Sequence, residues 1–240
     1  MDYLSRTLDT PEANLALDEA LLEQAEAARE PLELLRVWES PQVMVVVGRA
    51  SRVADEVDLE ACGQRPIPVY RRTSGGAAVV AGPGCLMYAV ILSYERHPEL
   101  HALDQAHDYV MDRVAAAVRR LDLPVDRQGI CDLTLADRKV SGNSVRCRRN
   151  ALLYHGTLLY DFPLELIHGC LKMPQRQPDY RQGRPHEDFV ANLRGVTAAQ
   201  LEESLRQTFS AEQTLDRLPE DAVARLAAEK FADPTWNLAR

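Results

Sequence analysis

The spacing of apolar residues changes several times along the chain, and each change predicts a new element. Over residues 10–28 the apolar side chains follow helical spacing, and one apolar face is formed by Leu15, Leu17, Leu21, Leu22 and Ala25. Thr10 followed by Pro11 is typical of the first turn of a helix. We therefore predict a helix over residues 10–28.

Short runs rich in valine and other apolar residues follow this helix and predict strands. Ser40 and Pro41 form a turn between the first two runs, which predicts that these two strands pair with each other. Gly75 and Gly76 stand between the next two runs and are typical of a hairpin. The predicted strands cover residues 34–38, 42–48, 68–72, 77–81 and 86–94.

Helical spacing returns in the second half of the chain. Apolar positions over residues 102–121 predict a helix that ends before Pro124, and residues 131–161 then predict two or three strands joined by tight polar turns. The remaining patterns predict helices over residues 164–173, 197–208 and 218–230, with a loop rich in Arg, Gln and Pro over residues 174–186.

The order of these elements limits the fold class. Strands that follow one another through short turns, without a helix after each strand, argue against a doubly wound nucleotide-binding fold. The sequence contains no internal repeat, low-complexity tract or linker-like segment. We therefore predict a single domain of mixed α/β (α+β) class over residues 1–240.

Composition narrows the possible partners. The chain has 240 residues, 46% of them hydrophobic, which is enough to bury a core. Its formal net charge of -8 argues against nucleic acid as a general partner, so any anionic partner must meet a local basic patch. No segment approaches about 18 uninterrupted apolar residues, and the N-terminus lacks the pattern of a signal peptide. We expect no membrane partner and a cytoplasmic location.

The five cysteines are widely spaced, and they form neither a CxxC pair nor a His/Cys cluster at zinc spacing. This pattern suits a reducing compartment. It predicts no metal site made by the protein alone.

Residues 71–84, "RRTSGGAAVVAGPG", place two arginines beside a glycine pair. The amides of such a turn can approach a ligand closely, and a guanidinium suits a phosphate or carboxylate. Arg71 and Arg72 alternate faces of a strand, so only one of them can point into a pocket beside the turn. The P-loop and GxGxxG patterns are absent. The segment is therefore a candidate anion site, with an ordinary hairpin as the alternative.

A second candidate group surrounds Lys139, which precedes what the pattern predicts as a tight turn at Ser141 and Gly142. A compact ammonium there can contact a phosphate oxygen and an acyl carbonyl together, and so stabilise developing charge. A solvated lysine on a strand edge is the alternative. His155 and Gly156 follow on an apolar run, where the glycine indicates close approach of a ligand or of neighbouring backbone.

Five segments, in this order, resemble the lipoate-protein ligase catalytic domain of the biotin/lipoate ligase and octanoyltransferase superfamily. They are "NLALDEALL" (14–22), "LRVWESPQVMVVVGR" (35–49), "RRTSGGAAV" (71–79), "DRKVSGNS" (137–144) and "HGTLLYD" (155–161). Biotin ligases are less similar, because their glycine-and-arginine repeat does not occur at residues 71–79. The resemblance implies a mostly antiparallel mixed sheet flanked by helices, of the class II synthetase and biotin/lipoate ligase type.

The resemblance also implies a two-step reaction, in which ATP, with Mg²⁺, adenylates lipoate or octanoate and the acyl group then passes to a lysine of an acceptor. Lys139 matches the family's catalytic lysine, which contacts carbonyl and phosphate, and Asp132 matches an acidic residue near the incoming amine. The positions implied to bind the acid and the nucleotide are Arg72, Ser74, Gly75, Gly76, Ala77, Ala78, Ser141, Gly142, His155 and Gly156. The apolar strands would form a tunnel for the acyl chain.

The sequence departs from the family pattern at several polar positions. The third glycine of the family is Ala77 here, its His-Asp pair is Ala81 and Gly82, and its asparagine is Cys85. The chain also stops near the end of the family's large domain, so we expect no C-terminal accessory domain. A separate accessory subunit is one way in which a short ligase of this kind could be completed.

Three functions remain open at this stage. The first is a lipoate-protein ligase. The second is an octanoyltransferase that takes the acyl group from a carrier protein through a cysteine thioester, with Cys131 as the candidate nucleophile. Asp132 beside that thiol opposes the role, because a negative neighbour raises a thiol pKa. The third is an acyl-binding relative without activity, against which the presence of Lys139 argues.

The resemblance implies a lipoyl acceptor domain or a glycine-cleavage H-like protein as the partner. Two basic islands on this acidic chain are candidate docking surfaces for an acidic acceptor, with ordinary solvated arginines as the alternative. They are "RCRR" (146–149) and the loop arginines Arg176, Arg181 and Arg184.

Overall fold

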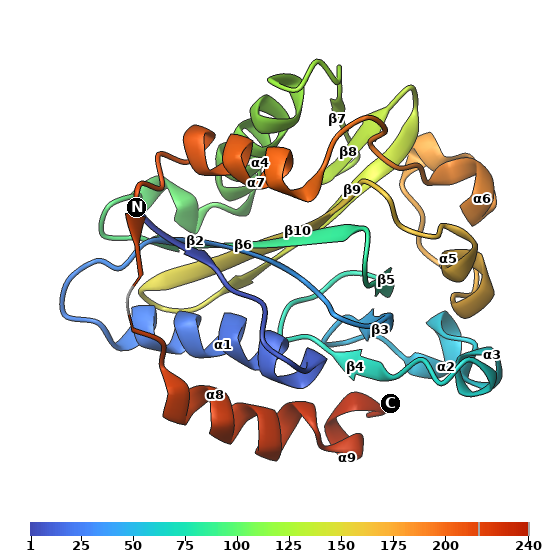
Figure 1. Ribbon diagram of the computed structural model, residues 1–240, viewed down its shortest axis with the longest axis horizontal. Coiled ribbons are helices and arrows are strands. Elements are labelled where there is room, and N and C mark those ends of the chain that lie inside the picture. Colours follow the sequence, from blue (N-terminus) through green and yellow to red (C-terminus); the bar gives the residue numbers. More distant parts are fainter. Residues whose placement is uncertain (216, 240) are drawn as a thin grey trace.

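A mixed sheet of eight strands runs through the computed structural model, which describes residues 1–215 and 217–239 (Figure 1). Its strand order is β11-β1-β2-β6-β10-β9-β8-β7. The two pairs that include β1 are parallel, and the other pairs are antiparallel. The strands are β1 (Asp2–Ser5), β2 (Leu34–Glu39), β6 (Cys85–Ser93), β7 (Asp126–Gln128), β8 (Asp132–Leu135), β9 (Arg138–Cys147), β10 (Ala151–Leu159) and β11 (Gln213–Thr214).

Helices cover both faces of this sheet. On one face lies α1 (Pro11–Ala27), whose first turn is capped by Thr10 as predicted, and α8 (Glu220–Leu226) packs against it. On the other face lie α4 (Leu103–Arg119) and α7 (Ala198–Thr208) (Figure 1). Every residue of β6 is buried, because alternate side chains face the two helical layers. This explains why β6 has a continuous apolar sequence.

A smaller sheet, in the order β4-β3-β5, stands beside the large one. Its strands are β3 (Met44–Val47), β4 (Val69–Arg71) and β5 (Val79–Ala81). Short helices surround it: α2 (Val53–Glu56), α3 (Leu59–Gln64), α5 (Glu165–Cys170), α6 (His186–Phe189) and α9 (Pro234–Asn237), with a 3₁₀ helix at Asp179–Arg181. Two further single-turn helices are Pro98–His101 and Ala227–Phe231.

Three predicted local connections are wrong. The strands predicted at 34–38 and 42–48 do not pair, since β2 lies in the large sheet and β3 in the small one. The predicted hairpin at Gly75 and Gly76 does not form, because β3 lies between β4 and β5 and pairs with both. Ser141 and Gly142 lie inside β9, and the turn before Lys139 is instead made by Ala136 and Asp137, both with positive φ.

The predicted mixed α/β class and the mostly antiparallel sheet flanked by helices are confirmed. The helices predicted at 10–28, 102–121, 197–208 and 218–230 are present with small changes at their ends. Strands β8, β9 and β10 occupy the region for which two or three strands were predicted. The short elements β1, β7, β11, α2 and α3 were not predicted.

Candidate active site

Two hollows meet where β9 and β10 face the segment before β5. The inner hollow, of about 110 Å³, lies between α1, β3 and the large sheet, and Leu15, Val46 and Met87 are among its apolar walls. The outer hollow, of about 140 Å³, opens toward α2, α5 and α6. The residues that line both are Ala77, Ala78, Val79, Lys139, Gly142 and Thr157. The glycine-rich segment and Lys139 therefore lie at the junction of an apolar hollow and a more charged one.

Lys139 is fixed at this junction by a carboxylate. Its Nζ lies 2.7 Å from Asp132 Oδ1, and the two side chains are 27% and 13% exposed. Asp132 stands on β8, next to β9, and its other oxygen accepts a hydrogen bond of 2.8 Å from the hydroxyl of Tyr180. Asp132 thus holds the ammonium and is itself held by a residue of the 174–186 loop. Lys139 and Asp132, which the resemblance implied as site residues, are therefore neighbours in space.

Gly142 provides the room that Lys139 needs. A Cβ atom at Gly142 would lie 2.9 Å from Lys139 Cε and 3.0 Å from Nζ. Both distances are shorter than an ordinary carbon contact. The absence of a side chain at Gly142 therefore lets the lysine fold back over β9 toward Asp132.

Arg72 braces the glycine-rich segment from inside. Its guanidinium donates to the backbone oxygens of Val46 and Ala77, both at 3.0 Å, and to that of Gly75 at 2.5 Å. Burial lowers the pKa of Arg72 to about 10, which still leaves it protonated at neutral pH. Arg72 is the arginine that turns toward the pocket, and it lines the inner hollow while holding the loop that forms the wall.

Arg71 points the other way, as the alternation of faces predicts. It is 1% exposed and donates to the backbone oxygens of Gly48, Ser51 and Trp236, at 2.7, 2.8 and 2.9 Å. It therefore ties the segment after β3 to α9, which is a structural role.

The amide of Ala78 meets a carboxylate of the chain itself. Ala78 N donates to Glu56 Oε2 at 2.5 Å, and Glu56 lines the outer hollow. The resemblance implied Ala78 as a binding position, and in this structure its amide is occupied by Glu56.

The buried Ser74 and the half-buried His155 form a pair beneath the turn. Ser74 Oγ lies 2.5 Å from His155 Nε2 and 3.1 Å from the Nε of Arg72, which donates to it. Burial, and then the positive charge of Arg72, lower the pKa of His155 to about 3. His155 is therefore neutral at physiological pH, and with Ser74 it supports the loop from the side of β10.

Gly156 allows a close approach, but the neighbours are side chains rather than the ligand or backbone that was predicted. A Cβ at Gly156 would lie 1.6 Å from Asn143 Oδ1 and 2.9 Å from the Tyr88 hydroxyl. The Tyr88 hydroxyl donates to Asn143 Oδ1, and Asn143 Nδ2 donates to the backbone oxygen of Cys131 at 2.7 Å. This polar network crosses the floor of the inner hollow, where Tyr88 and Asn143 both appear in the lining.

Cys131 is held as a thiol. Its Sγ donates to the backbone oxygen of Asn143 at 3.0 Å. Burial raises the pKa of Cys131, and the charge of Asp132 adds to this, while Lys139 and Arg72 oppose it. A nucleophilic cysteine needs a depressed pKa, so the surroundings of Cys131 disfavour thioester chemistry.

Three of the four positions at which the chain departs from the family pattern belong to the core. Ala81 and Cys85 are both fully buried, and a Cβ at Gly82 would lie 2.9 Å from Val43 Cα. Neither hollow is lined by Ala81, Gly82 or Cys85. Ala77 differs, because it lines both hollows and its backbone oxygen accepts a hydrogen bond from Arg72.

Two arginines of the 174–186 loop hold the loop in place. Arg181 is 4% exposed, stacks over Phe189 at 4.5 Å and donates to the oxygen of Arg184 at 2.9 Å. Arg184 donates to the oxygens of Tyr180 and Asp137 at 2.9 and 3.1 Å. These two arginines fold the loop over the outer hollow, and they do not form the surface island considered from sequence.

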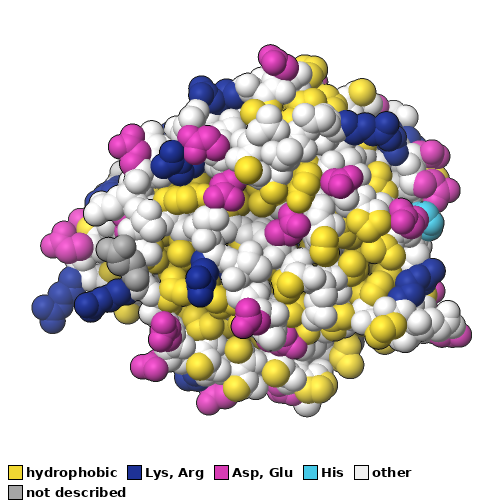
Figure 2. Space-filling view, in the orientation of Figure 1, with side chains coloured by type: hydrophobic (Ala, Val, Ile, Leu, Met, Phe, Trp, Pro, Cys, Tyr) yellow, Lys and Arg dark blue, Asp and Glu magenta, His cyan; other side chains and the backbone are white. Residues whose placement is uncertain are grey.

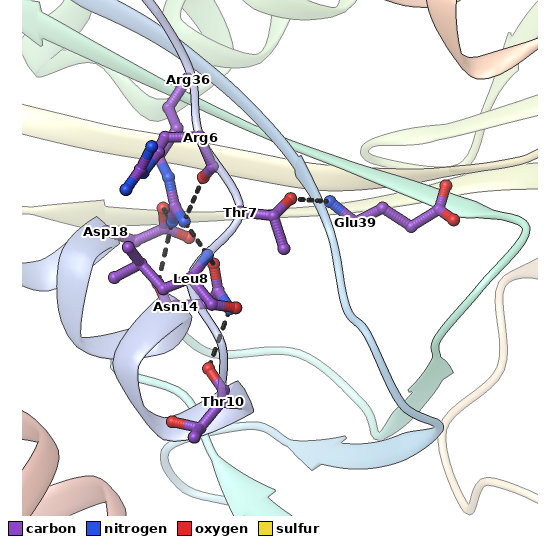
Figure 3. Close-up of polar contacts among 8 residues, drawn as sticks. All are labelled: Arg6, Thr7, Leu8, Thr10, Asn14, Asp18, Arg36 and Glu39. Carbon is purple, nitrogen blue, oxygen red and sulfur yellow. Dashed lines mark hydrogen bonds and ion pairs between the residues drawn. The ribbon is translucent and has the colours of Figure 1, made fainter.

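A buried ion pair anchors α1 behind the inner hollow (Figure 3). Arg36 on β2 is fully buried, lies 2.5 Å from Asp18 Oδ1 and donates to Asn14 Oδ1 at 2.7 Å. It also donates to the backbone oxygens of Arg6 and Asn14, at 3.0 and 2.9 Å. Because Asp18 and Leu15 both line the inner hollow, this network sets the position of one of its walls.

The catalytic-domain model of the lipoyl protein ligase A/B family matches residues 10–218 of the chain. The chain belongs to this family. It is 33% identical over 156 residues to a protein of Aeropyrum pernix that carries a lipoate-protein ligase A name, and the match covers 65% of this chain but only 56% of that relative. It is 26% identical over 267 residues to the octanoyltransferase LipM of Geobacillus kaustophilus, which covers 96% of this chain and 95% of the relative.

A solved structure of similar fold is the bi-partite lipoate protein ligase of Thermoplasma acidophilum, with a TM-score of 0.84 at 22% identity, covering 100% of this chain and 97% of that one. The predicted family, fold and class of enzyme are therefore confirmed. The relatives are named both as ligases and as octanoyltransferases, so the family likeness supports acyl attachment of one of these two kinds.

Sequence reasoning missed Tyr180, Tyr88, Asn143 and Glu56. Tyr180 and Glu56 come from loops and short helices whose positions no periodic pattern indicated. Asn143 lies inside the quoted segment "DRKVSGNS", so the motif contained it without a separate signal.

Within residues 1–215 and 217–239, no three His, Cys, Asp or Glu side chains are grouped to hold a metal ion. Over the same residues, no helix is long and apolar enough to cross a membrane.

Proposed function

We propose that the protein attaches lipoate, or octanoate, to a lysine of a lipoyl acceptor domain or glycine-cleavage H-like protein through an acyl-adenylate. The observation that carries this proposal is the position of Lys139. Its ammonium stands at the junction of the two hollows, 2.7 Å from the carboxylate of Asp132. An acyl-adenylate has an apolar chain, an acyl carbonyl and a nucleotide in this same order, so its mixed anhydride would lie beside Lys139.

The inner hollow suits the acyl chain and the outer hollow suits the nucleotide. Leu15, Val46 and Met87 offer apolar contact, worth about 0.8 kcal/mol for each buried methylene. The outer hollow has Lys172 and Arg176 in its lining, beside the carboxylates of Glu56 and Asp132, and these two cations suit phosphate oxygens. The solved structures of similar fold include a ligase bound with ATP and a protein with bound lipoic acid, which supports the same substrates here.

In the transfer step the acceptor amine forms a bond to the acyl carbon while the bond from that carbon to the AMP oxygen breaks. Lys139 is placed to stabilise negative charge on the carbonyl and the departing phosphate. Asp132 is placed to receive the proton that the amine loses, and Tyr180 holds Asp132 for this task. Magnesium would accompany ATP, bound to its phosphates and to water as Mg²⁺ commonly is.

We also propose that residues 1–240 act as one catalytic domain that a separate accessory subunit assists during adenylation. The Thermoplasma ligase of similar fold is described as bi-partite and with an E2 lipoyl domain, and a relative from the same organism is named lipoate-protein ligase A subunit 1. Both descriptions support a two-subunit arrangement.

The octanoyltransferase alternative is favoured by the LipM relative, which matches along nearly its whole length. The state of Cys131 opposes it, because the thiol is hydrogen-bonded and its pKa is raised. We therefore place the adenylate route first.

Two variants separate the routes when preformed lipoyl-adenylate and a lipoyl domain are supplied. Cys131→Ser is expected to retain the transfer rate, and Lys139→Ala to lose about 100- to 1000-fold. Loss of transfer in Cys131→Ser, or a wild-type rate in Lys139→Ala, would contradict the proposal.

A further inference from the structure

Three arginines that the proposed mechanism does not use gather near the site. Arg49 follows β3, Arg146 lies on β9, and Arg148 follows β9. We call them the arginine cluster. Arg146 faces the same side as Ser144, because Val145 and Cys147 pack into the core beneath α4 and strand side chains alternate.

The arginine cluster has more positive charge than its surroundings neutralise. The nearby carboxylate is Glu19 on α1, whose side chain is 4% exposed and already lies 2.6 Å from Lys230 Nζ. Arg148 reaches Glu19 only at 3.8 Å. Partial burial lowers the pKa of Arg146, and the positive charges of Arg49 and Arg148 lower it further. Within the described part of the chain, Arg146 Nε has no hydrogen-bond partner.

The arginine cluster borders the lip of the candidate active site. Residues 75–77 are exposed, and Ser144 Oγ donates to the oxygen of Gly75 at 2.9 Å. On the other side, the backbone amide of Arg49 donates to the oxygen of Ser74 at 2.8 Å. Arg146 is two residues beyond Ser144 on β9, so the cluster lies outside the lip at Gly76, which lines the inner hollow, and Ala77, which lines both hollows.

A local patch of this kind is what an acidic partner of this acidic chain would need. The chain has a net charge of -8, which repels an acidic protein at long range. On the face shown in Figure 2 acidic and basic side chains are interspersed, without a broad basic field. Because the arginine cluster has three arginines, charge complementarity would act over a small area, which suits a compact domain rather than an extended polyanion.

We propose that the arginine cluster is the docking surface for an acidic acceptor domain, one that presents carboxylates beside the lysine to be modified. This inference rests on the proposed function. Docking there places the acceptor lysine at the lip over Gly75, from which it reaches the acyl carbonyl beside Lys139.

The test measures transfer from preformed lipoyl-adenylate to two acceptors, a recombinant lipoyl domain with carboxylates next to its lysine and the small amine Nα-acetyl-lysine amide. The variants are Arg49→Glu and Arg146→Glu, singly and together. The double variant is expected to raise the KM for the domain by about tenfold at low salt, with a smaller difference at high salt. Its transfer to the small amine should stay at the wild-type rate, which also reports that the variant is folded.

Two controls sharpen the result. Arg120→Glu removes an exposed arginine at the end of α4, on the opposite face of the sheet, and should leave the KM for the domain unchanged. A lipoyl domain whose flanking carboxylates are changed to amides should show the raised KM with the wild-type enzyme and no further rise with the double variant.

An unchanged KM and salt dependence in the double variant would overturn the docking surface while transfer itself continues. A wild-type enzyme that transfers to neither acceptor would instead overturn the proposed function, and this inference with it. Octanoyl carrier protein can also be supplied as the acyl donor. If the double variant raised the KM for this carrier protein and left the KM for the lipoyl domain unchanged, the cluster would bind a donor and the proposal would be wrong.

Discussion

Replacing Gly142 with alanine moves the key ammonium without changing any charge. The new Cβ would lie 2.9 Å from Lys139 Cε and 3.0 Å from Nζ, so the end of the lysine must shift by about half an ångström to reach an ordinary contact. The ion pair between Lys139 and Asp132 is 2.7 Å long, and a shift of that size lengthens or redirects it. A displacement of about 1 Å at a reacting centre can cost about 100-fold in rate.

We therefore expect Gly142→Ala to slow acyl transfer by about 10- to 100-fold, or about 1.4 to 2.8 kcal/mol of transition-state stabilisation. The unfolding free energy should change by less than about 1 kcal/mol, because the displaced group is the flexible end of a side chain. Single-turnover transfer from bound lipoyl-adenylate measures the first quantity, and chemical denaturation the second.

Gly63→Ala is the matched control, because a Cβ at Gly63 would meet no atom within 4 Å beyond the adjacent residues and the backbone of its own helix. It should leave the transfer rate at the wild-type level. A Gly142→Ala variant that transfers as fast as Gly63→Ala would refute the reasoning that links the room over Gly142 to the position of Lys139.

Three further predictions concern the support of the site. Tyr180→Phe removes the donor that holds Asp132 at 2.8 Å and should slow transfer about tenfold, while the affinity for lipoyl-adenylate, measured by calorimetry, is unchanged. Arg72→Lys cannot span the carbonyls that the guanidinium joins, so urea denaturation should show a loss of about 2 to 4 kcal/mol; a loss below about 0.5 kcal/mol would contradict the bracing role. His155 has a pKa of about 3 in the fold against about 6.5 when unfolded, so the unfolded chain binds more protons between these values and stability falls as pH drops. From pH 7 to pH 5 this group should remove about 2 kcal/mol, and His155→Gln, which does not titrate, should lack that part of the acid sensitivity.

The sequence predicted those parts of the fold that depend on local pattern. The Thr10-Pro11 start predicted the helix α1, and the uninterrupted apolar run predicted the buried strand β6. Both elements are present. The pairing of strands could not be obtained in this way. The hairpin expected at Gly75 and Gly76 is absent because β3, far earlier in the chain, lies between the two flanking strands. The residues of a turn do not indicate whether a third strand lies between the two strands that the turn connects.

The same limit applies to the candidate site. Lys139 and Asp132 could be proposed because they stand in or beside a recognisable motif, and they are neighbours in the structure. Tyr180 and Glu56 reach the site from a loop and a short helix, and their side chains acquire a role only when those segments fold over the outer hollow. Arg72 could be placed near the pocket from its face of the strand, but its use of several backbone carbonyls depends on the folded loop.

The central claim is that the acyl group travels as an adenylate and never as a thioester on the protein. Intact-mass measurement tests it directly, with the enzyme incubated either with lipoyl-adenylate or with octanoyl carrier protein, and a lipoyl domain added afterwards. The account predicts that the enzyme keeps its unmodified mass in both cases, and that the lipoyl domain gains a lipoyl group from the adenylate. An acylated enzyme that forms from octanoyl carrier protein, passes its acyl group to the lipoyl domain and disappears in Cys131→Ser would contradict the account.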